Sequence, residues 1–186
     1  MKKSFFAILS LIVAGLVFAG CKEKKKTDVI ITEPVVKKVS NDTLSMDKLD
    51  AKSDVQWNGS NYHISIASST DKSMPVITDE GDNKYYDNKV TLRITRADGS
   101  SFFDKTFTKN DFKEYVSADY FENNALAGFV FDKVENGVLL FAVAVGSPDK
   151  FSDNFIPLDF KISKTGDVSI AVSQRDLVDP STDEGV

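Results

Sequence analysis

Four dipeptides that end in glycine recur along the chain, and each one joins two short segments in which apolar and polar residues alternate. Asparagine, aspartate and glycine readily adopt the positive φ angles of two-residue hairpin turns, and alternation with a period of two is typical of half-buried strands. The dipeptides are Asn58-Gly59, Asp98-Gly99, Asn136-Gly137 and Thr165-Gly166. They predict an all-β fold, an antiparallel meander that forms a sandwich or a partly closed barrel.

One segment departs from this alternation. Thr108 can cap the first amides of a helix, and Asp111 would lie near the positive end of the helix dipole. Phe112 and Tyr115 then fall on one helical face. We therefore expect a helix over residues 109–118, which closes an open end of the sheet.

The N-terminal segment is typical of an export signal. Lys2 and Lys3 precede an apolar run over residues 5–18, and small residues stand before Cys21, the one cysteine of the chain. The run is shorter than the roughly 20 residues that span a bilayer. The segment resembles the bacterial lipoprotein signal, which implies that the Cys21 sulfur receives a diacylglyceryl group and the new amino group a fatty acid such as palmitate. A plain secretory signal or a membrane-anchoring helix is the alternative.

The chain divides into four parts by composition. Residues 1–20 are the predicted signal peptide, and residues 21–53 are basic and polar without sustained periodicity, which favours a flexible tether behind the lipidated cysteine. Residues 54–176 hold the alternating segments of one β domain, a length that suits a single core. Residues 177–186 are an acidic tail.

Several motifs lie between residues 85 and 172: Asp98-Gly99 followed by residues 105–112, the predicted strand at 128–131, and residues 145–149 leading to 156–158. With these motifs the region resembles a group of uncharacterised Bacteroidetes-type lipoproteins that carry a domain of unknown function. The resemblance implies a tethered cell-envelope domain and brings no activity, ligand or catalytic residue with it.

Composition argues against nucleic-acid binding and gives little support to catalysis. The formal net charge is −5, whereas phosphate binding depends on clustered Lys and Arg. The one histidine, His63, falls on the outward face of its strand, and no Gly-x-Ser-x-Gly elbow is present to carry a nucleophile. We therefore assign no catalytic residue and no cofactor. A hydrolase that uses paired carboxylates, or a barrel that carries a ligand, is the alternative.

Two acidic loops have the oxygen ligands that Ca²⁺ prefers, at residues 78–83 running on to Asp87 and Asn88, and at residues 147–154. The spacing differs from an EF-hand, because Gly81 and Lys84 occupy the third and sixth positions counted from Asp79. We interpret both loops as solvated turns and predict no metal site.

Aromatic residues near turns are the remaining candidate site. Trp57, Tyr85 and Tyr86 are predicted to form a platform that stacks on a sugar or contacts a protein. Asp42-Thr43-Leu44 resembles the O-glycosylation acceptor of such bacteria, which implies modification at Thr43.

These features together predict a non-catalytic accessory module. The lipid at Cys21 would hold it at the outer membrane, most simply facing the periplasm, with the cell surface as the alternative. Its β surface would bind a protein or a glycan of the envelope.

Overall fold

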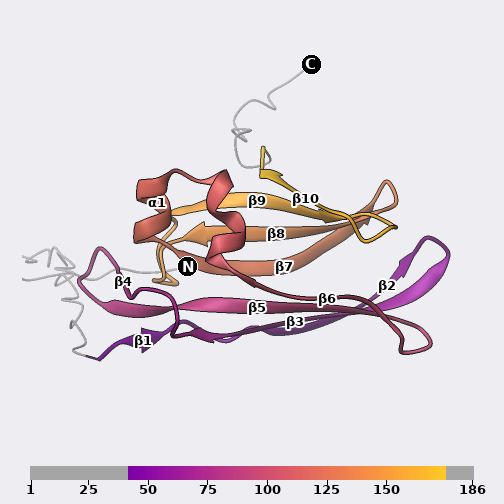
Figure 1. Cartoon of the computed structure of the whole chain (residues 1–186), viewed down its shortest axis with the longest axis horizontal. Helices are drawn as coiled ribbons and strands as arrows, with labels where there is room; N and C mark the ends of the chain where they lie inside the picture. Colours follow the sequence, from indigo (N-terminus) through magenta and orange to yellow (C-terminus); the bar gives the residue numbers. More distant parts are fainter. Residues whose placement is uncertain (1–41, 175–186) are drawn as a thin grey trace, which may run out of the picture. The chain divides into compact units, whose positions relative to one another are not determined.

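The computed structural model describes residues 42–174, which form two β-sheets packed face to face (Figure 1). The first sheet contains β1 (Leu44–Ser45), β2 (Asp50–Trp57), β3 (Ser60–Asp71), β4 (Ile77–Thr78), β5 (Lys84–Arg96) and β6 (Ser101–Thr108). The second contains β7 (Ala125–Glu135), β8 (Val138–Gly146), β9 (Phe155–Ile162) and β10 (Val168–Val172) in the order β10-β9-β8-β7. The predicted all-β fold is confirmed, and of the two predicted arrangements the chain adopts the sandwich.

All four predicted hairpins are present, joining β2 to β3, β5 to β6, β7 to β8 and β9 to β10. Asn58 and Gly59 have φ angles of 50° and 78°, as the two-residue turn with the twist of a hairpin requires. The four turns lie at the same end of the sandwich, on the right in Figure 1, which we call the turn end. The longer connections lie towards the opposite end, which we call the loop end.

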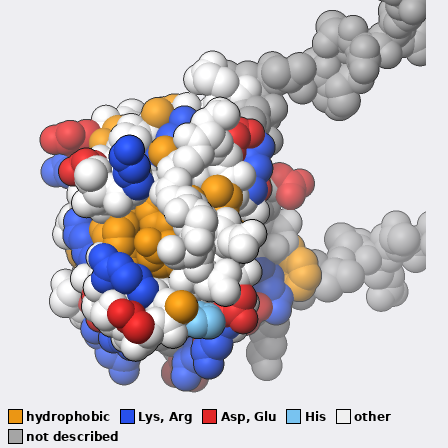
Figure 2. Space-filling model, turned by 90° about the vertical axis from the view of Figure 1, so that its right-hand side faces the viewer, with side chains coloured by type: hydrophobic (Ala, Val, Ile, Leu, Met, Phe, Trp, Pro, Cys, Tyr) orange, Lys and Arg blue, Asp and Glu red, His pale blue; other side chains and the backbone are white. Residues whose placement is uncertain are grey.

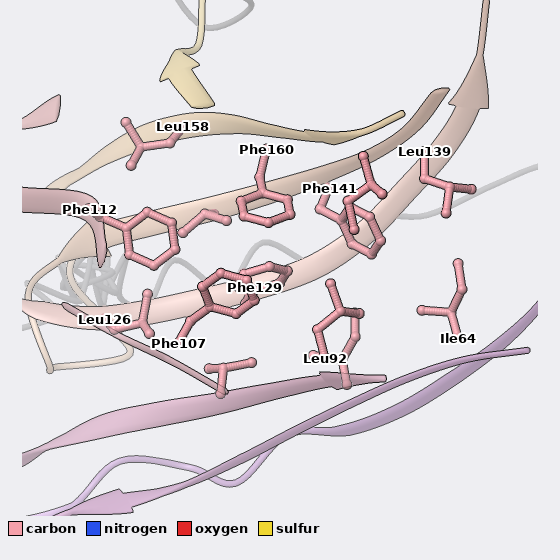
Figure 3. Close-up of a cluster of buried hydrophobic side chains, with 14 of the residues drawn as sticks. Ile64, Leu92, Phe107, Phe112, Leu126, Phe129, Leu139, Phe141, Leu158 and Phe160 are labelled. Atoms are coloured by element: carbon pink, nitrogen blue, oxygen red, sulfur yellow. The ribbon is translucent and has the colours of Figure 1, made fainter. Parts of the chain in front are cut away.

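Phenylalanine rings fill the space between the sheets (Figure 3). Phe107 on β6 lies 5.5 Å from Phe129 on β7 and 5.1 Å from Phe160 on β9, measured between ring centroids, so the two sheets meet through these rings. Edge-to-face and tilted contacts of this kind add to the free energy of burial. The remaining central rings are Phe112 and Phe141.

The predicted helix over residues 109–118 is split in two. A 3₁₀ helix, η1 (Lys109–Tyr115), is followed by a short α-helix, α1 (Ala118–Asn123). Val116 is extended, with φ −132° and ψ 157°, and the Ser117 hydroxyl accepts a hydrogen bond from the N–H of Tyr120, which starts the second helix. At the first helix, the Asp111 carboxylate accepts hydrogen bonds from the N–H and the hydroxyl of Thr108.

The folded region begins before residue 54, the predicted start of the β domain. β1 and the first four residues of β2 precede that boundary, because β2 alternates along its full length and pairs with β3 from Asp50 onwards. The predicted single meander is also divided, since η1 and α1 carry the chain from β6 in the first sheet to β7 in the second (Figure 1). The predicted signal peptide and acidic tail lie outside the described residues.

Candidate functional site

A groove of about 650 Å³ lies between the end of η1 and the strands β9 and β10. Its walls are largely apolar, with Phe155, Ile156 and Pro157 from β9 facing Tyr115 and Val116. Phe155 and Val172 leave 47% and 41% of their surfaces exposed. The other residues that line the groove are Glu114, Ser117 and Ser173.

The groove adjoins β10, the edge strand of the second sheet. The N–H of Ser173 donates a hydrogen bond to the carbonyl of Pro157 on β9. Along an antiparallel pair, every second residue bonds to the partner strand, and the residues between them point their backbone groups to the other side. Val168, Ile170 and Val172 therefore direct their backbone N–H and C=O groups away from β9. An extended chain can pair with such an edge, while pockets beside the edge select its side chains.

A buried ion pair at the loop end is the second notable cluster. Lys109 at the start of η1 and Asp87 on β5 are 3% and 0% exposed, and Lys109 Nζ lies 3.4 Å from Asp87 Oδ2. Lys109 Nζ donates a hydrogen bond of 2.6 Å to the carbonyl of Asn124 and lies 4.7 Å from the ring centroid of Phe121. The pair thus joins β5 to the crossover between the two sheets.

The two oxygens of Asp87 have different surroundings. Oδ1 accepts the N–H groups of Asn88 and Leu126, at 2.8 and 2.9 Å. Oδ2 is buried and forms no hydrogen bond of good geometry, and its nearest charged neighbour is Lys109 Nζ at 3.4 Å, whose charge attracts it. Burial raises the pKa of the Asp87 carboxyl above its ordinary value of 3.8, and the hydrogen bond from Leu126 and the charge of Lys109 act in the opposite direction.

Asp71 on β3 is the register partner of Asp87 and is also buried. Its Oδ1 accepts hydrogen bonds from the hydroxyl and the N–H of Ser73. These bonds lower the pKa of Asp71, although burial opposes them. Two neighbouring buried carboxyls therefore have pKa values shifted in opposite directions.

The predicted aromatic platform is wrong. Trp57 is 1% exposed, because its indole packs beneath Tyr62 and Phe102 with centroid distances of 5.0 and 5.2 Å. It lies at the turn end, where Figure 2 shows hydrophobic side chains with Lys and Arg beside them. Tyr85 and Tyr86 occupy the other end of β5 and are half-buried, so the structure does not bring the three residues together.

Trp57 instead ties the two sheets together. Its Nε1–H donates a 2.9 Å hydrogen bond to the carbonyl of Gly137, in the turn between β7 and β8. We expect Trp57→Phe to lower the free energy of unfolding by about 1 kcal/mol, because phenylalanine keeps an aromatic ring at this position but cannot donate the hydrogen bond to Gly137. Urea denaturation measures this, with Tyr62→Phe, which keeps its ring against Trp57, as the near-neutral control. An equal loss in both variants would contradict the assignment.

His63 is exposed on the outward face of β3, as expected, with its Nδ1 2.5 Å from Asp54 Oδ1 on β2. Exposed pairs of this kind contribute little to stability. The partner of His63 in this contact is a carboxylate, not a nucleophile. That the protein is not an enzyme stays a prediction.

The two acidic loops meet in a hollow of about 350 Å³ at the loop end. Their carboxylates support the loops themselves: Asp79 accepts the N–H groups of Gly81 and Asn83, and Asp149 accepts that of Phe151. The first of these loops, predicted to run from residue 78 to Asn88, ends sooner than expected, because Asp87 and Asn88 belong to β5. Within residues 42–174 no three His, Cys, Asp or Glu side chains are grouped as metal ligands.

Of the predicted modification sites, Cys21 lies outside the described residues. Thr43 directly precedes β1 and is half-buried. Among the residues that the structure describes, no helix is long and apolar enough to cross a membrane.

The sequence interpretation missed the Lys109–Asp87 pair and the groove. One signal for the pair was available, since Asp87 is a charged residue within a strand whose inward positions are apolar, and Lys109 directly follows another such strand. Their separation of many residues hides the pairing, and only the packing of η1 against β5 brings them into contact.

Two facing sheets and a phenylalanine core define this protein as a β-sandwich, and an apolar groove adjoins β10, an edge strand among residues 42–174. The chain belongs to the family described as domain of unknown function DUF4738, whose model matches residues 30–170. The match therefore covers every strand up to the middle of β10. No curated protein matches the chain.

Proposed function

We propose that this protein is a non-catalytic module of the bacterial cell envelope, held at the outer membrane by lipid on Cys21. It faces the periplasm and binds an extended apolar segment of a partner protein along β10 and the adjoining groove. The observation that carries this proposal is the coincidence of exposed Phe155 and Val172 with a sheet edge whose backbone groups point outward.

The chemistry of the groove favours a peptide over a glycan. Backbone pairing along β10 would supply affinity, and the apolar walls would accept alternate side chains of the added strand. A sugar platform needs an exposed aromatic face, whereas Trp57 is buried and Phe155 stands at the rim of an apolar hollow. The rings between the sheets support binding at the surface over carriage of a ligand inside.

The lipid anchor rests on the short apolar run before Cys21. Two or three acyl chains on one residue hold a protein at a membrane far more firmly than a single chain. We expect Cys21→Ser to remove the lipid and release the protein from the membrane fraction. Detergent partitioning and fractionation measure this, and a variant that stayed lipid-modified and membrane-bound would overturn the anchor.

Binding at the groove is tested with a charge placed on the edge strand. We expect Val172→Lys to reduce recovery of the partner at least about tenfold, because burying an ammonium against apolar walls is costly. The lipoprotein is purified from membranes with its partners, which are identified by mass spectrometry. Val134→Lys on β7 is the matched control, since Val134 is exposed to a similar degree, 38% against 41%.

The thermal transition of both variants should stay close to that of the parent chain, since both residues are exposed. Partner recovery that is unchanged by Val172→Lys, or reduced equally by Val134→Lys, would contradict the groove. A hydrolytic activity that disappears with His63→Ala would instead favour the alternative, an envelope hydrolase.

A further inference from the structure

The Lys109–Asp87 pair combines three features that are not usual in an ion pair of a folded protein. Both side chains are almost fully buried, one carboxylate oxygen has no hydrogen-bond partner, and the other accepts two backbone N–H groups. A buried charge pair stabilises a fold only when its remaining hydrogen-bonding groups are satisfied. The unsatisfied Oδ2 therefore points to a further role.

We propose that Lys109 Nζ and the side-chain carboxyl carbon of Asp87 become joined by an intramolecular amide bond, which covalently links β5 to the start of η1. The amine of Lys109 would attack the carboxyl carbon, the C–Oδ2 bond would break, and Oδ2 would leave as water. Because the ammonium and carboxylate together already hold the atoms of one amide and one water, no oxidant or co-reactant is required.

The surroundings suit each step of this condensation. Transfer of one proton from Nζ to Oδ2 would give the amine that attacks, and the second proton that Nζ loses as the C–N bond forms would also pass to Oδ2, which leaves as water. The raised pKa of Asp87 acts in the same direction. The Nζ and Oδ2 atoms are already 3.4 Å apart, so the reacting groups are held close together before reaction.

The two N–H groups on Oδ1 would stabilise the reaction intermediate. When the amine attacks, negative charge develops on the oxygen that stays, and fixed backbone donors aimed at such an oxygen lower the barrier. Asn88 and Leu126 provide these donors at 2.8 and 2.9 Å. Oδ1 is therefore the oxygen that remains in the amide.

The product satisfies more hydrogen-bonding groups than the ion pair does. Oδ2, the buried atom without a partner, is removed as water. The amide oxygen keeps the N–H groups of Asn88 and Leu126, and the hydrogen left on Nζ can still be donated to the carbonyl of Asn124. Removing an unsatisfied buried oxygen is favourable.

A cross-link of this kind would act like a disulfide. It closes a loop between β5 and η1 and so restricts the unfolded chain. The sequence has one cysteine and cannot form a disulfide within the chain. An amide would supply a covalent link that reducing agents do not break.

The test is tryptic peptide mapping of the full chain by mass spectrometry. Trypsin cuts after lysine, so a cross-linked chain yields residues 85–89 and 106–113 as one branched peptide, lighter than the sum of its parts by one water, with no cleavage after Lys109. Lys109→Arg, which lacks a primary amine, should release the two segments separately. Lys113→Arg, an exposed change on the same helix, should leave the branched peptide in place.

The parent chain alone decides the outcome, even if Lys109→Arg fails to fold. A branched peptide joined at Lys109 and Asp87 supports the proposal. Separate peptides, with cleavage after Lys109 and the full mass of each segment, would overturn it and leave the pair as a non-covalent contact.

Discussion

Phe129→Ala should lower the free energy of unfolding by about 4 kcal/mol, the largest loss expected from truncating a single side chain of the core. Phe129 contacts four other aromatic rings, at centroid distances of 5.5, 6.4, 5.8 and 5.2 Å. These rings come from both sheets and from η1, so the cavity left by truncation has walls that cannot collapse together easily. Chemical denaturation monitored by circular dichroism measures the loss.

The matched control for this prediction is Phe151→Ala. Phe151 is the same residue type but is 77% exposed in the loop between β8 and β9. Its truncation should change the free energy of unfolding by no more than about 0.5 kcal/mol. Similar losses in the two variants would show that Phe129 is not the centre of the core.

Lys109→Met should cost about 3 kcal/mol at neutral pH, because it leaves the Asp87 carboxylate buried with neither the cation nor the proposed amide bond of Lys109. The methionine retains most of the aliphatic stem, so the loss reports removal of the Lys109 nitrogen rather than of the packing. The double variant Lys109→Met with Asp87→Asn should regain part of this stability. Its neutral amide still accepts the N–H groups of Asn88 and Leu126.

The same variant gives a pH dependence with a defined sign. Burial raises the pKa of Asp87, so the folded state favours the protonated carboxyl, and stability is lost as the pH rises from the ordinary value of 3.8 through the raised native value. Lys109→Met should therefore be closest to the parent chain at the acidic end of this range. The loss of stability in Lys109→Met should therefore depend on pH. A loss that is independent of pH, or a double variant less stable than Lys109→Met, would contradict the conclusion that the buried Asp87 carboxylate causes it.

The elements with local signals were predictable. Asn58-Gly59 and Asn136-Gly137 demand positive φ angles whatever surrounds them, and alternation fixes which side chains of a strand share a face. The helix signal was only partly local: Thr108 and Asp111 mark its start, but the extended conformation of Val116 that divides it was not evident from the pattern of apolar residues.

The candidate site was less predictable than the fold. An aromatic residue beside a turn has no local feature that distinguishes an exposed ring from a buried one, and Trp57 is buried because Tyr62 and Phe102 cover it. The groove needs residues from η1, β9 and β10, which meet only when the chain has crossed from one sheet to the other.

The sequence by itself determined the β class, the four hairpins and the outward position of His63, since these depend on contacts between near neighbours in the chain. Tertiary structure alone decided that the strands form two sheets, that Trp57 belongs to the core, and that Lys109 meets Asp87. The physical reason is that sheet stacking and burial are set by contacts between residues far apart in the sequence. A pattern of alternation specifies the face that a residue occupies but not what will cover that face.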